Sequence, residues 1–132
     1  MKKVLILIVI IAFLGFETDR GKASKGNAGK VKVMLLYPNE EGKSFDINYY
    51  SKKHMPMVAA FFGDALKGYG IEKGVDSTFP KEKTPHVAIG YFLFDSVEDY
   101  YNSFGPNTDK ILNDIPNYTS IQPVIQITEI VH

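Results

Sequence analysis

The residue pair best suited to chemistry in this sequence is His54 and Tyr50, which lie four positions apart in a segment of helical pattern. Residues at this spacing share one face of an α-helix, so the imidazole and the phenol are expected to be neighbours. Histidine accepts and returns protons near pH 7, and a tyrosine can orient it or stabilise an enolate. The pair predicts proton transfer, with His54 as base and acid and Tyr50 as its hydrogen-bond partner. The alternative is that both residues are structural.

The remaining histidines and tyrosines are candidates for contacts with a substrate. His86 follows Pro85 at the start of a predicted strand, where it is either an ordinary edge residue or a binding residue. Tyr49 and Tyr91 belong to a group of tyrosines that mainly pack, although a hydroxyl pointing into a pocket would bind a carbonyl or phenolic oxygen.

The sequence contains no motif typical of a metal site, a reactive thiol or a nucleotide-binding loop. The three histidines show no spacing typical of a metal site, and there is no cysteine to form a disulfide or act as a nucleophile. No glycine-rich loop suited to a nicotinamide or flavin nucleotide is present. We therefore predict neither a metal nor a cofactor.

The elements that must position these residues occur in the order β-α-β-β-α-β, which is the split pattern of ferredoxin-like α+β domains. The first helix begins after the N-cap Asp46, has a predicted kink or break at Pro56, and ends at Gly63. The second begins at Ser96 and is interrupted at residues 105–106, before another helical piece around Ile111. The strands are predicted at residues 31–37, 67–75, 86–94 and 120–131.

Small residues in the predicted strands leave space near the middle of the sheet. They are Gly68, Gly70, Gly74, Ala88 and Gly90. This space either forms a pocket or lets the helices pack closely, and the sequence does not separate these two interpretations.

The central strands are apolar on both faces. Residues 33–36 and most of 87–94 are apolar, whereas a sheet with helices on one side should alternate in polarity. Something must cover the second face. The sheet of a second subunit is the economical cover, so we predict a homodimer.

Composition and charge narrow the classes of function. With 45% hydrophobic and 13% aromatic residues in 132, the chain has the composition of one globular domain. The net charge is zero, but residues 31–132 carry nine basic and thirteen acidic residues, a net charge of −4. This excludes a nucleic-acid-binding protein. The only arginine, Arg20, lies outside this segment, so strongly anionic substrates are disfavoured.

The N-terminal segment resembles an export signal. Two lysines precede an uncharged apolar stretch of thirteen residues, Val4 to Phe16, which is short for a membrane-spanning helix. We predict that residues 1–30 are a signal peptide or an N-terminal anchor with a linker, and that 31–132 form the domain. The protein is then periplasmic or extracellular, or membrane-anchored if the leader is uncleaved.

Several segments of the domain are similar to the EthD family, named after ethyl tert-butyl ether degradation, within the dimeric α+β barrel superfamily. The matching segments are residues 36–39, 45–57, 94–97, 104–106 and 114–119, of which the stretch from Tyr49 to Pro56 is the most specific. The resemblance implies a ferredoxin-like subunit, a side-by-side dimer, and a pocket between sheet and helices at the positions of Tyr50 and His54.

Two main hypotheses about function remain open. The first is an isomerase, cyclase or lyase that transfers protons on a small, largely apolar carbonyl or phenolic compound. The second is a non-catalytic protein that binds a small hydrophobic ligand or serves an accessory role. Some relatives of the EthD family carry the label of a reductase, which makes an oxidoreductase a further alternative. Haem-dependent oxidation, as in other dimeric barrels, is weaker, because those proteins place the iron-binding histidine elsewhere.

Overall fold

A four-stranded antiparallel sheet in the order β2-β3-β1-β4 forms one layer of the computed structural model, which describes residues 26–132. The strands are β1 (Val31–Pro38), β2 (Gly68–Lys73), β3 (His86–Phe94) and β4 (Val124–Glu129). With helices between β1 and β2 and between β3 and β4, this order is that of a ferredoxin-like α+β fold. The fold class predicted from the sequence is confirmed.

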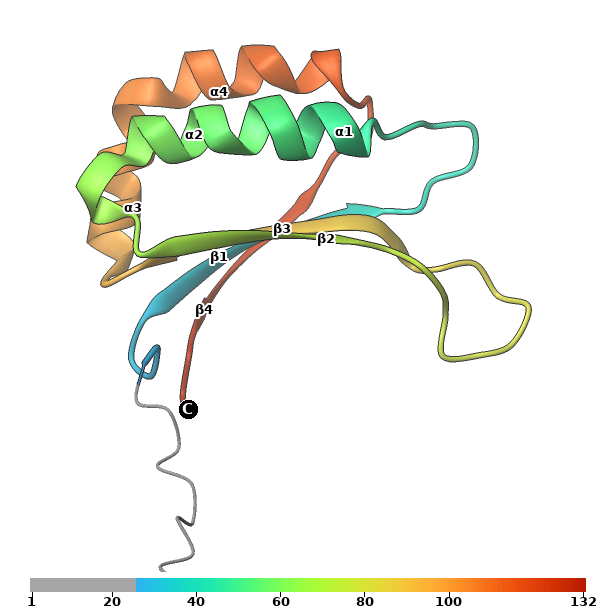
Figure 1. Ribbon diagram of the computed structural model, residues 1–132, viewed down its shortest axis with the longest axis horizontal. Helices are drawn as coiled ribbons and strands as arrows, with labels where there is room; N and C mark the ends of the chain where they lie inside the picture. Colours follow the sequence, from blue (N-terminus) through green and yellow to red (C-terminus); the bar gives the residue numbers. More distant parts are fainter. Residues whose placement is uncertain (1–25) are drawn as a thin grey trace, which may run out of the picture.

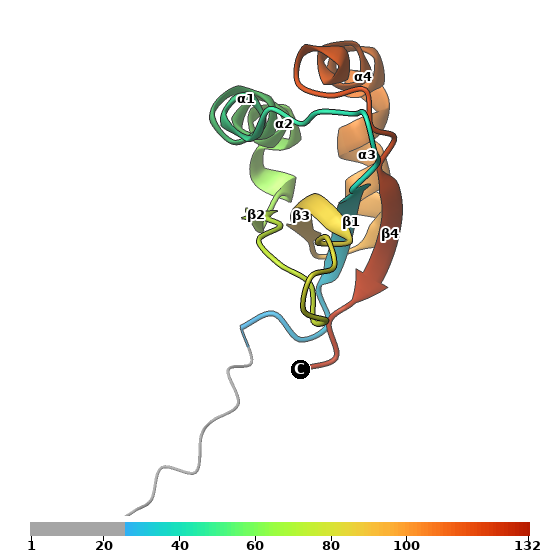
Figure 2. The ribbon, with the colours of Figure 1, turned by 90° about the vertical axis from the view of Figure 1, so that its right-hand side faces the viewer.

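The helices form a second layer over one face of the sheet (Figure 1). The first part of this helical layer is one continuous helix, here called the rod. It consists of α1 (Ile47–Tyr49), a π-helical turn (Tyr50–His54) and α2 (Met55–Phe62). Beyond β3 follow α3 (Val97–Phe104) and α4 (Thr108–Asp114), and α4 lies beside the rod (Figures 1 and 2). Short 3-10 turns occupy Gly63–Ala65, Gly105–Asn107 and Ile115–Asn117.

The helix starts are fixed by the predicted capping residues. The Asp46 carboxylate accepts the backbone N–H of Tyr49 at 3.0 Å, and the Ser96 hydroxyl accepts that of Asp99 at 3.0 Å. Each satisfies one of the backbone donors left free in the first turn of a helix. These two N-caps therefore set where the polypeptide enters the helical layer.

Pro56 does not break the first helix, contrary to the predicted kink or break. Proline has no N–H, and its ring conflicts with the carbonyl four residues earlier in a regular α-helix. The chain instead widens before the proline: the backbone N–H of Met55 donates to the carbonyl of Tyr50, five residues back. Pro56 then lies in the first turn of α2, where a missing N–H is tolerated. The helix thus runs on to Phe62 by way of a π-helical turn.

The last strand is shorter than the predicted 120–131, because it begins only at Val124. Pro123 cannot donate to a strand ladder and ends the pairing on the N-terminal side. Before it, the backbone N–H of Ile121 donates to the Thr119 hydroxyl at 3.0 Å. This leaves a non-strand segment that leads from the helical layer to the sheet edge.

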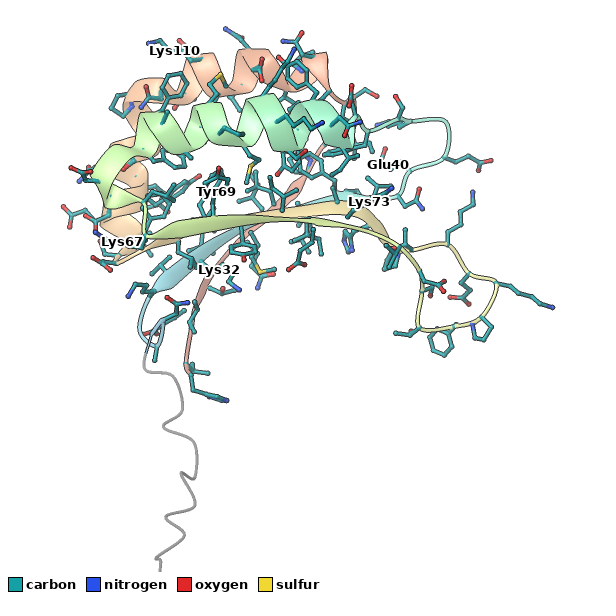
Figure 3. The ribbon with its side chains drawn as sticks, in the orientation of Figure 1. Lys32, Glu40, Lys67, Tyr69, Lys73 and Lys110 are labelled. Atoms are coloured by element: carbon teal, nitrogen blue, oxygen red, sulfur yellow. The ribbon has the colours of Figure 1, made fainter. Side chains whose placement is uncertain are left out.

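The core lies between the two layers. On β1 and β3, Val33 pairs with Phe92 and both side chains are buried beneath the helices. On β2, Tyr69 points to the same side, while Lys32 on β1 points to the opposite side (Figure 3). From the helices, Met55, Val58, Phe62 and Ile111 complete the core.

Tyrosines fill the space beside two of the strand glycines, Gly70 and Gly90. A Cβ atom at Gly90 would overlap the Tyr50 hydroxyl, and one at Gly70 would overlap the Tyr91 ring. Of the two interpretations left open by the sequence, close packing of the helix holds at Gly90, whereas at Gly70 the neighbouring ring is that of Tyr91 on β3, not a helix residue. The cavity of this protein lies elsewhere between the layers.

The leader predicted at residues 1–16 lies outside the described residues. Across residues 26–132, no helix combines the length and apolar character needed to cross a membrane.

Candidate functional site

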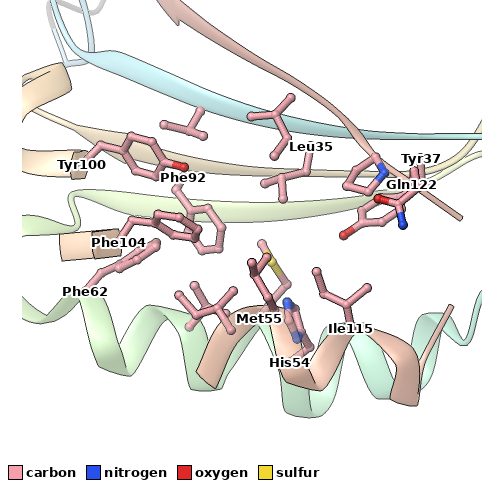
Figure 4. Close-up of a pocket in the computed structure, with 16 residues that line it drawn as sticks. Leu35, Tyr37, His54, Met55, Phe62, Phe92, Tyr100, Phe104, Ile115 and Gln122 are labelled. Carbon is pink, nitrogen blue, oxygen red and sulfur yellow. The ribbon is translucent and has the colours of Figure 1, made fainter. Parts of the chain in front are cut away.

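A cavity of about 180 Å³ lies between the sheet and the helices. Figure 4 shows aromatic side chains at one end of it, from Phe62, Phe92, Tyr100 and Phe104, and polar groups from Tyr37, His54 and Gln122 elsewhere along it. Leu112 on α4 and Ile125 on β4 also line the cavity and are 50% and 55% exposed. The cavity therefore opens to the surface between α4 and the edge strand β4.

The π-helical turn brings His54 to the wall of this cavity. His54 is the last residue of this turn, and only 3% of its surface is exposed. The imidazole points from the helix toward the sheet (Figure 4). Isolated π-helical turns are rare and recur at functional sites, which marks His54 independently of its residue type.

Asp114 holds the imidazole in one orientation. Its Oδ2 atom lies 2.8 Å from Nδ1 of His54. A carboxylate only accepts hydrogen bonds, so Nδ1 carries the proton and Nε2 carries the lone pair. Within residues 26–132, no group is hydrogen-bonded to Nε2, which leaves this nitrogen available to a molecule in the cavity.

The other carboxylate oxygen of Asp114 is also satisfied. Oδ1 accepts the Tyr49 hydroxyl at 2.7 Å and the Asn117 side-chain amide at 3.0 Å. These bonds hold the carboxylate at the oxygen that does not contact His54, so that its orientation does not depend on His54 alone. The result is an ordered chain from Tyr49 through Asp114 to the imidazole.

The electrostatics of the pair keep His54 neutral and Asp114 ionised. Burial lowers the pKa of His54 below its ordinary value, and the nearby Asp114 carboxylate offsets this only in part. For Asp114, burial acts to raise the pKa, but hydrogen bonds from Tyr49, His54 and Asn117 outweigh it and the pKa lies below its usual range. Near neutral pH the site thus presents an unprotonated imidazole nitrogen to the cavity.

Tyr50 is beside His54, as the sequence predicts, but it is not its hydrogen-bond partner. The two rings are stacked with centroids 5.7 Å apart and planes 18° apart. The Tyr50 hydroxyl points to the sheet at Gly90 and has no hydrogen-bond partner among the described residues. The prediction is corrected in this respect: the partner of His54 is Asp114, because the stacked phenol directs its oxygen away from the imidazole.

The predicted substrate-binding residues have different positions. Tyr49 does not line the cavity and acts on it only through Asp114. Tyr91 lies on the other face of the sheet, with the Lys32 ammonium 4.8 Å from its ring centre. His86 starts β3 opposite Pro38, away from the cavity. The structure therefore brings neither Tyr91 nor His86 to His54.

Sequence reasoning missed Asp114, which is separated from His54 by 60 positions. One local signal was available, because Asp114 is the last residue of α4 and an acidic residue is unfavourable at the negative end of a helix dipole. Among residues 26–132, no cluster of three or more histidine, cysteine or acidic side chains is arranged to hold a metal ion.

The sheet, the one-sided helical layer and the cavity between them define a ferredoxin-like α+β protein with room for a small ligand. No protein-family model matches the chain, and no curated protein matches it. Solved structures do match it. An EthD-like protein from Ralstonia eutropha is 42% identical, covering 80% of this chain and 95% of its own, with a TM-score of 0.76.

Two further structures are more distant. An ethyl tert-butyl ether (EthD) family protein from Bacillus halodurans is 17% identical, covering 76% of this chain and 97% of its own, with a TM-score of 0.54. A dimeric protein of unknown function with a ferredoxin-like fold, from Bacteroides fragilis, is 12% identical over 78% and 98%, with a TM-score of 0.43. On the strength of the Ralstonia protein, the chain belongs to the EthD-like family.

Proposed function

We propose that this protein is an enzyme that transfers a proton on a small, largely apolar carbonyl or phenolic compound. The observation that supports this most directly is the contact of His54 Nδ1 with Asp114, which leaves Nε2 unprotonated at the cavity wall. A neutral, oriented imidazole is a general base, and such groups contribute about 10²- to 10⁴-fold to rate. Tyr50 supports the imidazole by stacking rather than by hydrogen bonding.

The size of the cavity limits the substrate. Apolar cavities of about 150 Å³ bind benzene. At about 180 Å³, with aromatic residues at one end, this cavity suits a molecule with one ring or a short chain. The proposed substrate therefore carries one carbonyl or phenolic oxygen on a small apolar body.

The test is exchange of deuterium into the α-carbons of small ketones, with cyclopentanone and cyclohexanone as probes, followed by NMR in D₂O. We expect His54→Gln to lower the exchange rate by about 100-fold or more while the folded variant still binds the ketone. His86→Gln is the matched control, because it removes a histidine outside the cavity. Exchange that is unchanged in His54→Gln would contradict the proposal.

A non-catalytic ligand-binding protein is the second candidate. The observation in its favour is the predominantly apolar lining, which can hold a hydrophobic molecule without reacting with it. In this case a bound ketone shows no exchange above that in buffer, and His54→Gln changes neither rate nor affinity. No feature of residues 26–132 favours the oxidoreductase alternative.

We also propose that the protein forms a homodimer through the face of the sheet opposite the helices. Figure 2 shows no helix on this face. By strand alternation it carries Met34, Leu36, Ile89, Tyr91 and Val124, which adjoin one another across β3, β1 and β4. Val124 is exposed and the other four are partly exposed, and a contiguous apolar patch of this kind is typical of an interface.

Sedimentation of residues 26–132 is expected to give twice the monomer mass at micromolar concentration. Leu36→Asp places a charge in the middle of the patch and should yield a folded monomer. Tyr101→Asp is the control, because Tyr101 is an exposed apolar side chain, 59% accessible, that lies on α3 and outside the patch. A wild-type monomer would refute the proposed dimer.

For residues 1–30 we propose the export role predicted from the sequence. Expression of the full chain should direct the protein to the membrane or beyond it, whereas a chain lacking these residues should remain soluble in the cytoplasm. Identical soluble, unprocessed fractions for both would contradict this role.

A further inference from the structure

The Tyr37 hydroxyl gives the cavity a second buried polar group, on the wall opposite His54. Tyr37 lies on β1 and is 0% exposed, and it lines the cavity from the sheet whereas His54 lines it from the helix. Figure 4 shows the Tyr37 hydroxyl directed away from its strand, into the space between the layers. The cavity lining thus includes an imidazole from the helix and a phenol from the sheet.

The hydrogen bonds of Tyr37 leave a proton available. Its oxygen lies 2.7 Å from that of Tyr118, and either hydroxyl can be the donor. The Tyr50 hydroxyl also lies close enough to Tyr37 to affect its pKa, but within residues 26–132 it makes no hydrogen bond of normal geometry. The bond between Tyr37 and Tyr118 therefore uses one of their two protons. Tyr118 does not line the cavity. When Tyr118 donates to Tyr37, the Tyr37 proton can be donated to an oxygen in the cavity.

Aromatic contacts hold this hydroxyl in place relative to the imidazole. The Tyr118 ring packs against both His54 and Tyr37, with centroid distances of 4.6 Å and 6.1 Å. Phe45 packs on the edge of Tyr37 at 4.8 Å. Burial raises the pKa of Tyr37, so that the hydroxyl keeps its proton near neutral pH. The donor is therefore preorganised before a ligand arrives.

We propose that Tyr37 is a further catalytic residue, which donates a hydrogen bond to the carbonyl oxygen of a neutral, enolisable substrate while His54 acts on the adjacent carbon. This inference rests on the proposed function. It deepens it by naming the substrate class: a carbonyl compound of about one ring, with an acidic C–H beside the C=O group. No lysine or arginine lines the cavity in the described part of the chain, so a carboxylate or phosphate would lack a counter-charge.

The electrons and the proton balance without a second reactant. His54 Nε2 takes the proton, the pair of the broken C–H bond forms a C=C bond, and the C=O pair moves onto oxygen. Negative charge thus develops at the atom bound by Tyr37, where the hydrogen bond strengthens. After the Nε2 proton exchanges with solvent, His54 returns a proton to the original carbon, which gives exchange, or to the far carbon of a conjugated enolate, which gives isomerisation of a C=C bond.

The test uses 4-nitrophenolate as an enolate analogue, in the full chain carrying His54→Gln. Absorbance distinguishes bound phenol from bound phenolate during a pH titration, and no imidazole is present to take the proton. Adding Tyr37→Phe should weaken phenolate binding by about 10- to 100-fold, the effect of losing a hydrogen bond to a charged group. It should also shift ionisation of the bound nitrophenol to higher pH.

Two control variants identify the donor. Tyr101→Phe removes a hydroxyl on α3, outside the cavity, and should change nothing. Gln122→Leu removes the side-chain amide from the cavity lining and should have a smaller effect than Tyr37→Phe. The proposal is overturned if Tyr37→Phe binds phenolate as tightly as Tyr101→Phe, or if Gln122→Leu accounts for the loss.

If Tyr37→Phe does not fold, the pH titration of nitrophenol bound to His54→Gln, with Tyr37 intact, is sufficient to test the proposal. Ionisation of bound nitrophenol at or below its pH in solution supports a donor in the cavity, whereas a shift to higher pH by one unit or more, or no binding at millimolar concentration, overturns it. Because these measurements lack the imidazole, their outcome is independent of the deuterium-exchange test of His54.

Discussion

Gly90→Ala tests how tightly the helix layer is packed onto the sheet. A Cβ atom at Gly90 would overlap the buried Tyr50 hydroxyl and lie 3.1 Å from Tyr50 Cζ and 3.3 Å from Met55 Cε. Tyr50 is fully buried, so its ring has no open space into which it can move. The substitution must therefore push the π-helical turn away from β3.

The expected loss of stability follows from two opposing effects. Overpacking of a core typically destabilises by about 1–3 kcal/mol. Replacing glycine by alanine within a strand recovers about 0.5–1 kcal/mol of backbone entropy. We expect a net loss of about 1–2 kcal/mol for Gly90→Ala, on the balance of these two ranges.

Tyr50→Phe should rescue much of this loss, because it removes the oxygen that the new methyl group would overlap. On its own, Tyr50→Phe should be neutral or slightly stabilising, since the hydroxyl is buried without a partner. The double variant should show a favourable coupling of about 1 kcal/mol, as expected for residues in direct contact. The contact at Cζ remains, so rescue is incomplete.

Urea unfolding at fixed pH measures all four proteins of this cycle, with Gly68→Ala as the control. A Cβ atom at Gly68 would lie 3.4 Å from Leu93, an ordinary contact, so Gly68→Ala should be neutral or stabilising. The packing argument is refuted if Gly90→Ala is as stable as Gly68→Ala, or if the cycle shows no coupling.

Three further predictions concern the site and its supports. The free energy of unfolding should fall as pH decreases below about 6.5, because the pKa of His54 is lower in the folded protein and the unfolded chain therefore binds a proton at higher pH. Urea unfolding at several pH values should show this decrease in the parent protein and not in His54→Gln. Asp114→Asn should reduce ketone exchange by about 100-fold or more with little change in ketone affinity, since the imidazole loses its orienting charge; an unaltered rate would count against this role. Ser96→Ala should destabilise by about 0.5–2 kcal/mol through loss of the cap on Asp99, as urea midpoints will show, whereas an unchanged midpoint would mean that solvent replaces the cap.

The sequence was sufficient for the fold because its local signals agree. Apolar runs predict the strands, and the caps at Asp46 and Ser96 predict helix starts that the structure confirms. The errors occurred where proline acts differently at two places. Pro56 widens a helix that tertiary packing keeps intact, whereas Pro123 shortens β4. A proline predicts a disturbance of backbone pairing, but surrounding contacts decide its form.

The site was predictable only in part. His54 stood out by residue type and position, but its partner Asp114 is brought to it by the packing of α4 beside the first helix, which depends on long-range contacts. Tyr50 was assigned to the imidazole by helical spacing, which places ring beside ring and says nothing about the direction of the hydroxyl. Tyr37 gave no motif, because alternation along β1 identifies it only as a core residue.

The π-helical turn also constrains which changes in chain length the protein can accept during evolution. A π-helical turn holds one residue more than the α-helical turn it replaces, so a one-residue deletion between Tyr50 and His54 would restore a regular helix. One part of the rod would then be rotated by about 100° and shifted by about 1.5 Å relative to the other. Either Tyr49 would lose Asp114, or Met55 and Phe62 would leave the core. Insertions and deletions should thus be accepted in the loop between β2 and β3, while the length of residues 46–62 stays fixed among relatives that use this histidine.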